Sequence, residues 1–251
     1  MLFPLMDARC FMKFEDYSHT FLHFHTTEVP AILKKYLSGN VGLVDLGAGD
    51  GNLLISLKTA GLLDQFSKVV AVELSQERCE RLRTYTNFKV ICGDATNVSE
   101  LEPESFDFVL CTQVIEHVDE AKLLAQISKL LKPNGTAYIA SLIKEKHGWW
   151  YYRTADGKWA LDPTHLREYE SVEQYEAVIK KGGFTIVETV TSRLELSIIE
   201  FVLRRIVVPL FKPEHIHSFF IQYPFADWIR RHFNVRPPGY HIVETIAKKA
   251  Q

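Results

Sequence analysis

The chain has 251 residues, of which 47% are hydrophobic and 24% are charged, so it is long enough to bury a globular core. Its formal net charge of −2 excludes the general basic field that non-specific nucleic-acid binding needs. No apolar run is long enough to cross a bilayer, and the apolar start lacks the basic segment of a signal peptide. The four cysteines show no C-x-x-C spacing and are expected to be reduced thiols, which favours a cytoplasmic protein.

Residues 1–40 precede the first predicted strand. Aromatic and histidine side chains crowd residues 12–25, and Thr26-Thr27 introduces a predicted helix over residues 28–37. Such aromatic side chains need a surface to cover them. We therefore expect either a plain addition to the core or an N-terminal helical lid.

Strand and helix patterns then alternate along residues 41–143, the expected cofactor-binding core. Short apolar runs predict strands at residues 41–46, 68–73, 88–92, 106–111 and 136–142. Helical patterns predict helices at residues 52–60, 76–85 and 119–131. Near-continuous apolar strands are typical of a parallel sheet that is covered on both faces. The alternation predicts a doubly wound, Rossmann-like α/β fold within a single domain of residues 1–251.

The rest of the chain is less regular. Residues 144–169 read as a long aromatic loop, and residues 171–181 and 184–189 as a helix and a strand. A mostly helical, apolar and basic insertion over residues 194–235 precedes a last strand at residues 241–247.

The turn Gly47-Ala48-Gly49-Asp50-Gly51 lies between the first strand and a helix, so it is a candidate ligand cradle. Glycines permit positive φ and leave no Cβ in the way, and a helix start adds free N–H groups. The pattern is G-x-G-x-G, with Asn52 where the dinucleotide fingerprint has its third glycine. Asp45 would repel a pyrophosphate but suits an ammonium group. The turn therefore favours a zwitterionic nucleoside over NAD.

Acidic side chains stand at the ends of the next predicted strands, where ligands bind in open α/β sheets. Glu73 ends the second strand, about twenty residues after the glycines, as expected for an acid that binds ribose hydroxyls. Asp94 follows the third strand and could accept from an adenine amino group. These ends predict one pocket for an ammonium group, a ribose and an adenine.

Five motifs in this order resemble the class I S-adenosylmethionine-dependent methyltransferases, and most closely the branch with the ubiquinone-biosynthesis O-methyltransferases. They are Val-Asp-Leu-Gly-Ala-Gly-Asp-Gly, Val-Glu-Leu-Ser, Cys-Gly-Asp-Ala, Gln-Val-Ile-Glu-His-Val and Leu-Lys-Pro-Asn-Gly. The resemblance implies a seven-stranded sheet with an antiparallel last strand and S-adenosyl-L-methionine as the cofactor. It implies that the cofactor is bound by Asp45, Gly47, Ala48, Gly49, Glu73, Leu74, Asp94, Ala95 and Gln113.

Two histidines are candidate catalytic bases, because a hydroxyl acceptor needs a base to take its proton. His165 follows the aromatic loop beyond the fifth strand, and Asp162 or Arg167 could orient it. His117 opens a helix, where a purely structural role is the competing interpretation.

A metal is the alternative use of these histidines. Some related RNA 2′-O-methyltransferases hold a divalent cation with Glu-x-x-Glu-His and a distant His. The corresponding residues here are Gln113, Glu116 and His117, with His165 as the distant His. Glutamine in place of the first Glu removes a charge, so we expect no metal.

The acceptor side is predicted from the aromatic run before His165. Trp149, Trp150, Tyr152 and Arg167 are the candidate acceptor-binding residues, and they suit a ring-shaped or apolar molecule. We therefore predict a methyltransferase for a small molecule, with a hydroxyl of a sugar, a quinol-like or a lipid-linked compound as the acceptor.

Three other functions stay open at this point. They are an RNA 2′-O-methyltransferase with a divalent metal, a non-catalytic cofactor-binding subunit and, as the weakest, an NAD-dependent oxidoreductase. We expect no DNA partner. A homodimer and a peripheral membrane contact through residues 194–235 are both compatible with the sequence.

Overall fold

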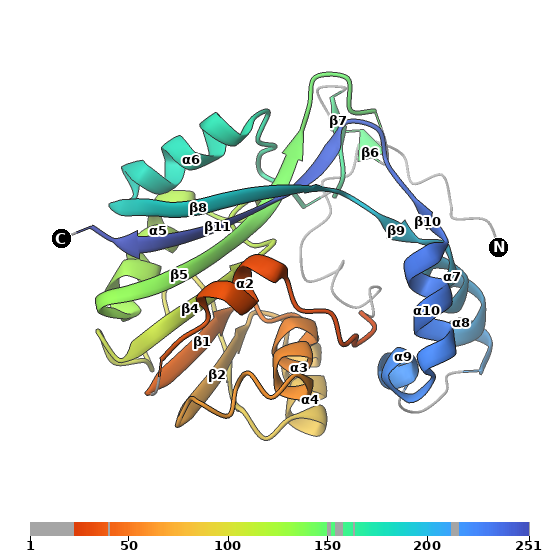
Figure 1. Cartoon of the computed structure of the whole chain (residues 1–251), viewed down its shortest axis with the longest axis horizontal. Coiled ribbons are helices and arrows are strands. Elements are labelled where there is room, and N and C mark those ends of the chain that lie inside the picture. The colour runs from red at the N-terminus through yellow and green to blue at the C-terminus, as the bar shows by residue number, and fades with distance from the viewer. Residues whose placement is uncertain are drawn as a thin grey trace.

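The computed structural model describes residues 23–39, 41–149, 152–153, 158–162, 164–211 and 216–250. Its centre is a seven-stranded sheet in the order β3-β2-β1-β4-β5-β11-β8 (Figure 1). The strands are β1 (Gly42–Leu46), β2 (Lys68–Glu73), β3 (Lys89–Cys92), β4 (Phe106–Thr112), β5 (Leu131–Lys144), β8 (Phe184–Arg193) and β11 (Tyr240–Lys249). Strand β11 is antiparallel to both of its neighbours, β5 and β8, while the other neighbouring strands pair in parallel. The predicted Rossmann-like sheet with an antiparallel last strand is confirmed.

Helices cover both faces of the sheet. They are α2 (Ala31–Tyr36), α3 (Asn52–Thr59), α4 (Gln76–Tyr85), α5 (Glu120–Leu130) and α6 (Val172–Lys181). Leucines of α3 and α4 pack on one face together with Leu43 of β1, whereas α5 and α6 pack on the other face together with Val44. Successive residues of β1 thus enter two different cores. This explains why the strands read as continuous apolar runs.

Some boundaries differ from the sequence expectation. Helix α2 begins at Ala31, not at residue 28, because Pro30 forces the preceding residue away from helical angles. Strands β8 and β11 are longer than predicted, since their antiparallel ladder runs from Arg193 and His241 to Phe184 and Lys249. Exposed polar residues in β8 obscured this length in the sequence.

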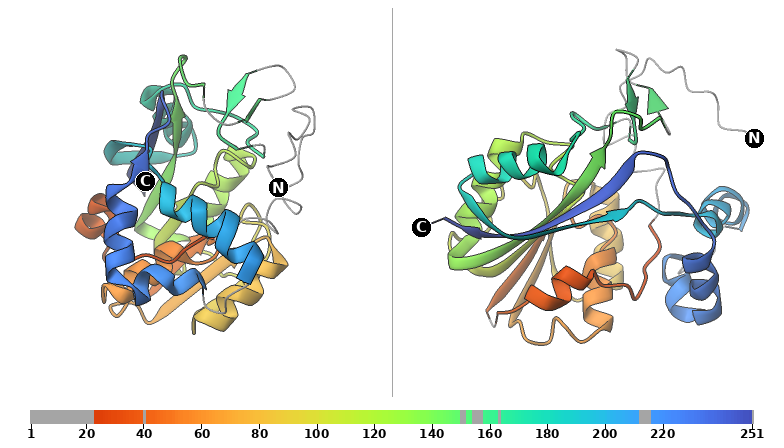
Figure 2. Two further views of the ribbon diagram at one scale, coloured as in Figure 1. Left: turned by 90° about the vertical axis from the view of Figure 1, so that its right-hand side faces the viewer. Right: turned by 45° about the horizontal axis from the view of Figure 1, so that its top comes forward.

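The aromatic loop and the insertion contain short elements. The loop carries the hairpin β6 (Tyr152–Arg153) and β7 (Trp159–Ala160). The insertion consists of β9 (Leu196–Ser197), α7 (Ile198–Val202), a π-helical turn (Leu203–Val207), α8 (Val208–Phe211), a 3-10 turn (Ile216–Ser218), α9 (Phe219–Gln222), α10 (Pro224–His232) and β10 (Asn234–Val235). We call residues 196–235 the helical lobe. It lies beside one end of the sheet and is joined to β8 and β11 through the paired strands β9 and β10 (Figures 1 and 2).

The cysteines correct one expectation. Cys79 of α4 and Cys92 of β3 form a disulfide, while Cys111 is a buried free thiol. The expectation of four reduced thiols is therefore wrong for two of them, and its support for a cytoplasmic location is lost. Among the described residues, none of the helices combines the length and the apolar character that crossing a membrane requires.

Candidate active site

The glycine turn has the geometry that its sequence indicates. Gly47, Gly49 and Gly51 have φ angles of 78°, 59° and 82°, which only glycine adopts freely. A Cβ on Gly47 would come within 2.3 Å of Val114 Cγ2, so packing requires this glycine. A Cβ on Gly49 would meet no atom of the described residues within 4 Å, so these residues leave open space over it. The turn thus presents bare backbone to a space that a ligand can fill.

Glu73 connects the glycine turn to the start of α4. One carboxylate oxygen, Oε2, accepts from the N–H of Gly49 at 2.8 Å, and Oε1 accepts from the N–H of Ser75 at 2.9 Å. The side chain is only 3% exposed. A carboxylate that accepts two such bonds is fixed in position.

Asp45 adds a second carboxylate at the end of β1. It is 2% exposed, and burial, together with the nearby charge of Glu73, raises the pKa of Asp45 to about 7. Two buried carboxylates that lie close together repel each other, and a bound cation would relieve this repulsion. An ammonium group beside Asp45 would supply this positive charge.

The other predicted cofactor residues follow the strands β2, β3 and β4. Gln113, at the end of β4, has a φ angle of 55° and donates its N–H to Ala140 O at 2.9 Å. Asp94 is exposed after β3, where its Oδ1 accepts from Thr96 N at 2.8 Å. Ala95 is buried, and Leu74 is 53% exposed. Their role in cofactor binding stays a prediction.

The structure brings the two predicted histidines together. The rings of His117 and His165 lie edge to face with their centroids 4.6 Å apart. Thr164 Oγ1 contacts His117 Nδ1 at 2.9 Å and also donates to Asp162 Oδ1. His165 Nδ1 lies 3.0 Å from Glu168 Oε1. Segments about fifty residues apart in the sequence thus form one partly buried cluster.

The surroundings give the two rings different pKa values. Burial and the neighbouring His165 lower the pKa of His117 to about 4, so this ring is neutral near pH 7. For His165, burial opposes the charged form, but the hydrogen bond and the charge of Glu168 outweigh it and raise the pKa. A histidine that is oriented by a carboxylate is suited to take a proton.

Glu168 and Thr164 are the functional candidates that sequence reasoning missed. The sequence offered Asp162 or Arg167 to orient His165, whereas Asp162 accepts from Thr164 and Arg167 donates to backbone carbonyls. The signal for Glu168 was its spacing of three residues from His165, which is compatible with a contact in a tight loop. The contact between Glu168 and His165 could not be predicted, because residues 164–168 do not follow a helical pattern.

Glu116 completes a group that could hold a metal ion. Ligand atoms of Glu116, His117 and His165 all lie within 4.8 Å of one another. Glu116 is 2% exposed. Burial raises the pKa of Glu116 to about 7. A buried carboxylate with two imidazoles is a reasonable donor set for a divalent transition metal.

The predicted acceptor residues lie in different settings. Arg167 donates to the backbone carbonyls of Ile115 and Val118, so its guanidinium braces the turn after β4. Trp149 is 49% exposed and meets the ring of Trp159 edge to face at 6.4 Å. Trp150 and the side chain of Tyr152 lie outside the described residues. Contact of these four residues with an acceptor stays a prediction.

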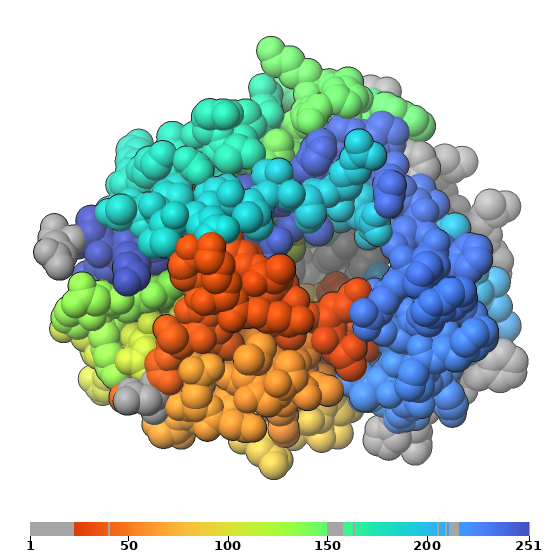
Figure 3. Space-filling view, in the orientation of Figure 1, coloured from red at the N-terminus to blue at the C-terminus, as the bar shows by residue number. Residues whose placement is uncertain are grey.

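The described end of the N-terminal segment contacts the glycine turn. The backbone N–H of His23 donates to Asp50 Oδ2 at 3.1 Å, and His25 Nε2 lies 2.9 Å from Asp50 O. His25 N also donates to His217 O of the helical lobe. Figure 3 shows a hollow bordered by this segment, the helical lobe and β8–β9. The predicted lid segment spans residues 1–40, and its residues 1–22 lie outside the described residues.

Comparisons with known proteins agree with this geometry. Residues 44–139 match a family described as a methyltransferase domain. The ubiquinone biosynthesis O-methyltransferase of Photobacterium profundum is 29% identical over 106 residues, which are 40% of this chain and 43% of that protein. The Rickettsia akari enzyme of the same name is 27% identical over 178 residues, 64% of this chain and 67% of that protein. The matches thus span about half the length of these curated relatives.

A solved structure shows the same fold. It is an S-adenosylmethionine-dependent methyltransferase from Methanosarcina mazei, with a TM-score of 0.56 and 14% identity. The likeness covers 88% of this chain and 98% of that one. Residues 44–139 of this protein form a methyltransferase domain.

Proposed function

We propose that this protein transfers a methyl group from S-adenosylmethionine to a hydroxyl of a small molecule. The observation that carries the proposal is the arrangement of two buried carboxylates around an open glycine turn. Asp45 suits the ammonium group of the cofactor, and Glu73 suits its ribose hydroxyls. Gly47, Ala48 and Gly49 would line the methionine part together with Gln113. Leu74, Asp94 and Ala95 would surround the adenine.

The protein's share of the chemistry is binding, orientation and proton removal. S-adenosylmethionine, when bound, supplies an electrophilic methyl group on a sulfonium. Holding an acceptor oxygen in line with that group lowers the barrier by several kcal/mol. His165, oriented by Glu168, takes the proton of the acceptor hydroxyl, while neutral His117 packs against its ring. Trp149, Trp150 and Tyr152 would then receive the ring or apolar part of the acceptor.

Titration calorimetry combined with a turnover assay tests the proposal. The full chain should bind S-adenosylhomocysteine, and it should transfer labelled methyl from S-adenosylmethionine to a member of a panel of sugars, quinols and lipid-linked hydroxyl compounds. Absence of cofactor binding would refute the proposal. Binding without turnover of any acceptor would favour a non-catalytic cofactor-binding subunit.

Asp45 makes the affinity for the cofactor depend on pH. Its pKa of about 7 in the free protein means that the carboxylate ionises as the pH rises from 6 to 8. Only the ionised form attracts the ammonium group, so S-adenosylhomocysteine should bind about tenfold more tightly at pH 8 than at pH 6. Calorimetry at both pH values measures this change.

The matched control is Asp45→Asn, which keeps the shape of the side chain and removes its charge. Its affinity should be weaker at pH 8 and nearly independent of pH. An unchanged pH dependence in Asp45→Asn would show that another group titrates.

The stability of the fold depends on pH with the opposite sign. The pKa of Asp45 in the folded protein lies above its ordinary value of 3.8, so its contribution to the free energy of unfolding falls as the pH rises from 3.8 to about 7.

A metal-dependent reaction is the second candidate, because ligand atoms of the buried Glu116 and of two histidines all lie within 4.8 Å of one another. Glu116, His117 and His165 would hold the ion, and the ion would orient the acceptor oxygen. If the base mechanism holds, activity should survive exhaustive EDTA treatment within about twofold. Loss of activity that Mg²⁺, Mn²⁺ or Zn²⁺ restores would favour the metal.

A further inference from the structure

The helical lobe exposes an unusual amount of apolar surface. In the described part of the chain, fifteen large hydrophobic side chains are exposed, and ten of them belong to residues 196–235. These ten are Ile198, Phe201, Val202, Ile206, Leu210, Tyr223, Phe225, Trp228, Phe233 and Val235. The exposed fractions reach 73% for Phe225 and 69% for Leu210. Such a concentration marks a surface that contacts something other than water.

Helix α10 shows how this surface arises. Its Arg230 is buried and donates to Asp227 at 2.7 Å and to Glu28 of the N-terminal segment at 2.5 Å. The rings of Phe225 and Trp228 remain about half or more exposed and stack with their centroids 6.0 Å apart. An amphipathic helix ordinarily turns its apolar side to the core. Here the ion pairs attach the polar side to the protein, and much of the apolar side faces outward.

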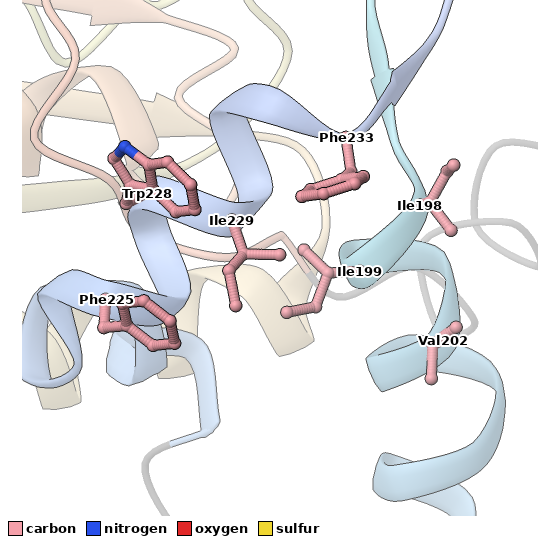
Figure 4. Close-up of a pocket in the computed structure, with 7 residues that line it drawn as sticks. All are labelled: Ile198, Ile199, Val202, Phe225, Trp228, Ile229 and Phe233. Atoms are coloured by element: carbon pink, nitrogen blue, oxygen red, sulfur yellow. The ribbon is translucent and has the colours of Figure 1, made fainter.

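The exposed side chains of α7 and α10 line an apolar groove of about 560 Å³ (Figure 4). Ile199 and Ile229 approach each other across it, and Phe233 closes one end. All seven lining residues are hydrophobic: Ile198, Ile199, Val202, Phe225, Trp228, Ile229 and Phe233. Without polar side chains to orient a ligand, the groove favours hydrocarbon over a polar molecule.

The charge of this region selects the kind of partner. Residues 194–236 contain six Lys and Arg and four Asp and Glu, a net charge of +2. The whole chain carries −2, so the remaining residues carry −4. A basic surface attracts an anionic one, whereas two copies meeting through this face would bring like charges together. Trp and Tyr side chains at the same surface are typical of the boundary between lipid and water.

We propose that the helical lobe docks the protein on the surface of an anionic lipid bilayer. Phe225, Trp228 and Leu210 would enter the headgroup region, where such helices bury about 5–10 Å of their apolar side. Arg231 and Arg236, whose side chains are 40% and 61% exposed, form ion pairs with Asp227 and Glu195 within this net-positive region and would also meet lipid phosphates. The proposal is independent of methyl transfer, since its test measures lipid binding only.

Vesicle sedimentation with the full chain tests the proposal. The probes are vesicles of phosphatidylcholine alone and of phosphatidylcholine with phosphatidylglycerol at a ratio of about 3:1. The wild type should bind the anionic vesicles at low salt and lose most of that binding at high salt, because salt screens the charges. Phe225→Ser/Trp228→Ser should weaken binding by at least about tenfold, given the hydrophobic free energy of two large side chains. Val187→Ser, at a residue of β8 that is 43% exposed, is the matched control and should bind as the wild type does.

Two further measurements keep the result decisive. A thermal unfolding temperature equal to that of the wild type shows that the double variant is folded. If the double variant is not folded, Trp228→Phe takes its place. Brominated lipids should quench tryptophan emission in the wild type, and Trp228→Phe should lose most of that quenching. No binding of the wild type to anionic vesicles at low salt would overturn the proposal. So would a dimer in light scattering that Phe225→Ser/Trp228→Ser dissociates, because the face would then join two copies.

Discussion

Replacing His165 by Gln is expected to lower kcat by about 10²–10⁴-fold while leaving the affinity for S-adenosylhomocysteine unchanged. The reason is that Gln keeps a polar side chain of similar reach but cannot accept the proton of the acceptor hydroxyl. His165 is the better base of the pair, because Glu168 raises its pKa whereas burial lowers that of His117 to about 4. Single-turnover rates with saturating cofactor measure the loss.

The matched variant is His117→Gln in the same cluster. It should reduce kcat less than His165→Gln, because this ring packs against His165 and contacts Thr164 but is too weak a base. A larger loss in His117→Gln would reverse the assignment of the two histidines. Equal losses that are accompanied by lower thermal stability would indicate a structural role for the pair.

The role of His165 as the base can also be tested through the pH dependence of kcat in a Glu168 variant. His165 must be neutral to accept a proton, so kcat should rise as the pH passes upward through its pKa. The carboxylate of Glu168 raises that pKa, hence Glu168→Gln should move the acidic limb of the profile to lower pH. A profile that keeps its position would show that Glu168 does not act through His165.

The local part of the site was predictable from the sequence. The glycine turn, Asp45 and Glu73 belong to consecutive strand ends, and the parallel sheet places those ends side by side. Near-continuous apolar runs were enough to identify the central strands, since each strand is covered on both faces. The fold and the methyltransferase domain were therefore predicted correctly.

The rest depends on contacts that the sequence does not encode locally. His165 meets His117 only because the loop after β5 returns to the end of β4, where Leu166 N donates to Glu116 O. The sequence predicted a mostly helical insertion over residues 194–235, but the orientation of α10 depends on the contact between Arg230 and Glu28, which lie 202 residues apart. The disulfide likewise joins a helix and a strand whose proximity is a property of the fold.

Glu73→Ala is expected to weaken the binding of S-adenosylhomocysteine by about 100-fold or more. The carboxylate holds the N–H groups of Gly49 and Ser75, and it is the proposed acceptor for both ribose hydroxyls. Each hydrogen bond to a charged group contributes about 1.5–3 kcal/mol, and the loss of two such bonds accounts for the factor. Calorimetry of the purified variant measures the affinity.

A structural loss must be separated from the loss of ribose contacts. Glu80→Ala is the matched control, since Glu80 is an exposed residue of α4 that accepts from Gln76 at the surface, so affinity should stay within about twofold. Glu73→Gln should bind with intermediate affinity, because its amide oxygen still accepts one bond while the charge is gone. If Glu73→Ala binds the cofactor product within threefold of the wild type, Glu73 is not the ribose acid. The site would then have to bind its ligand through Asp45 alone, and the preference for a nucleoside would lose its main support.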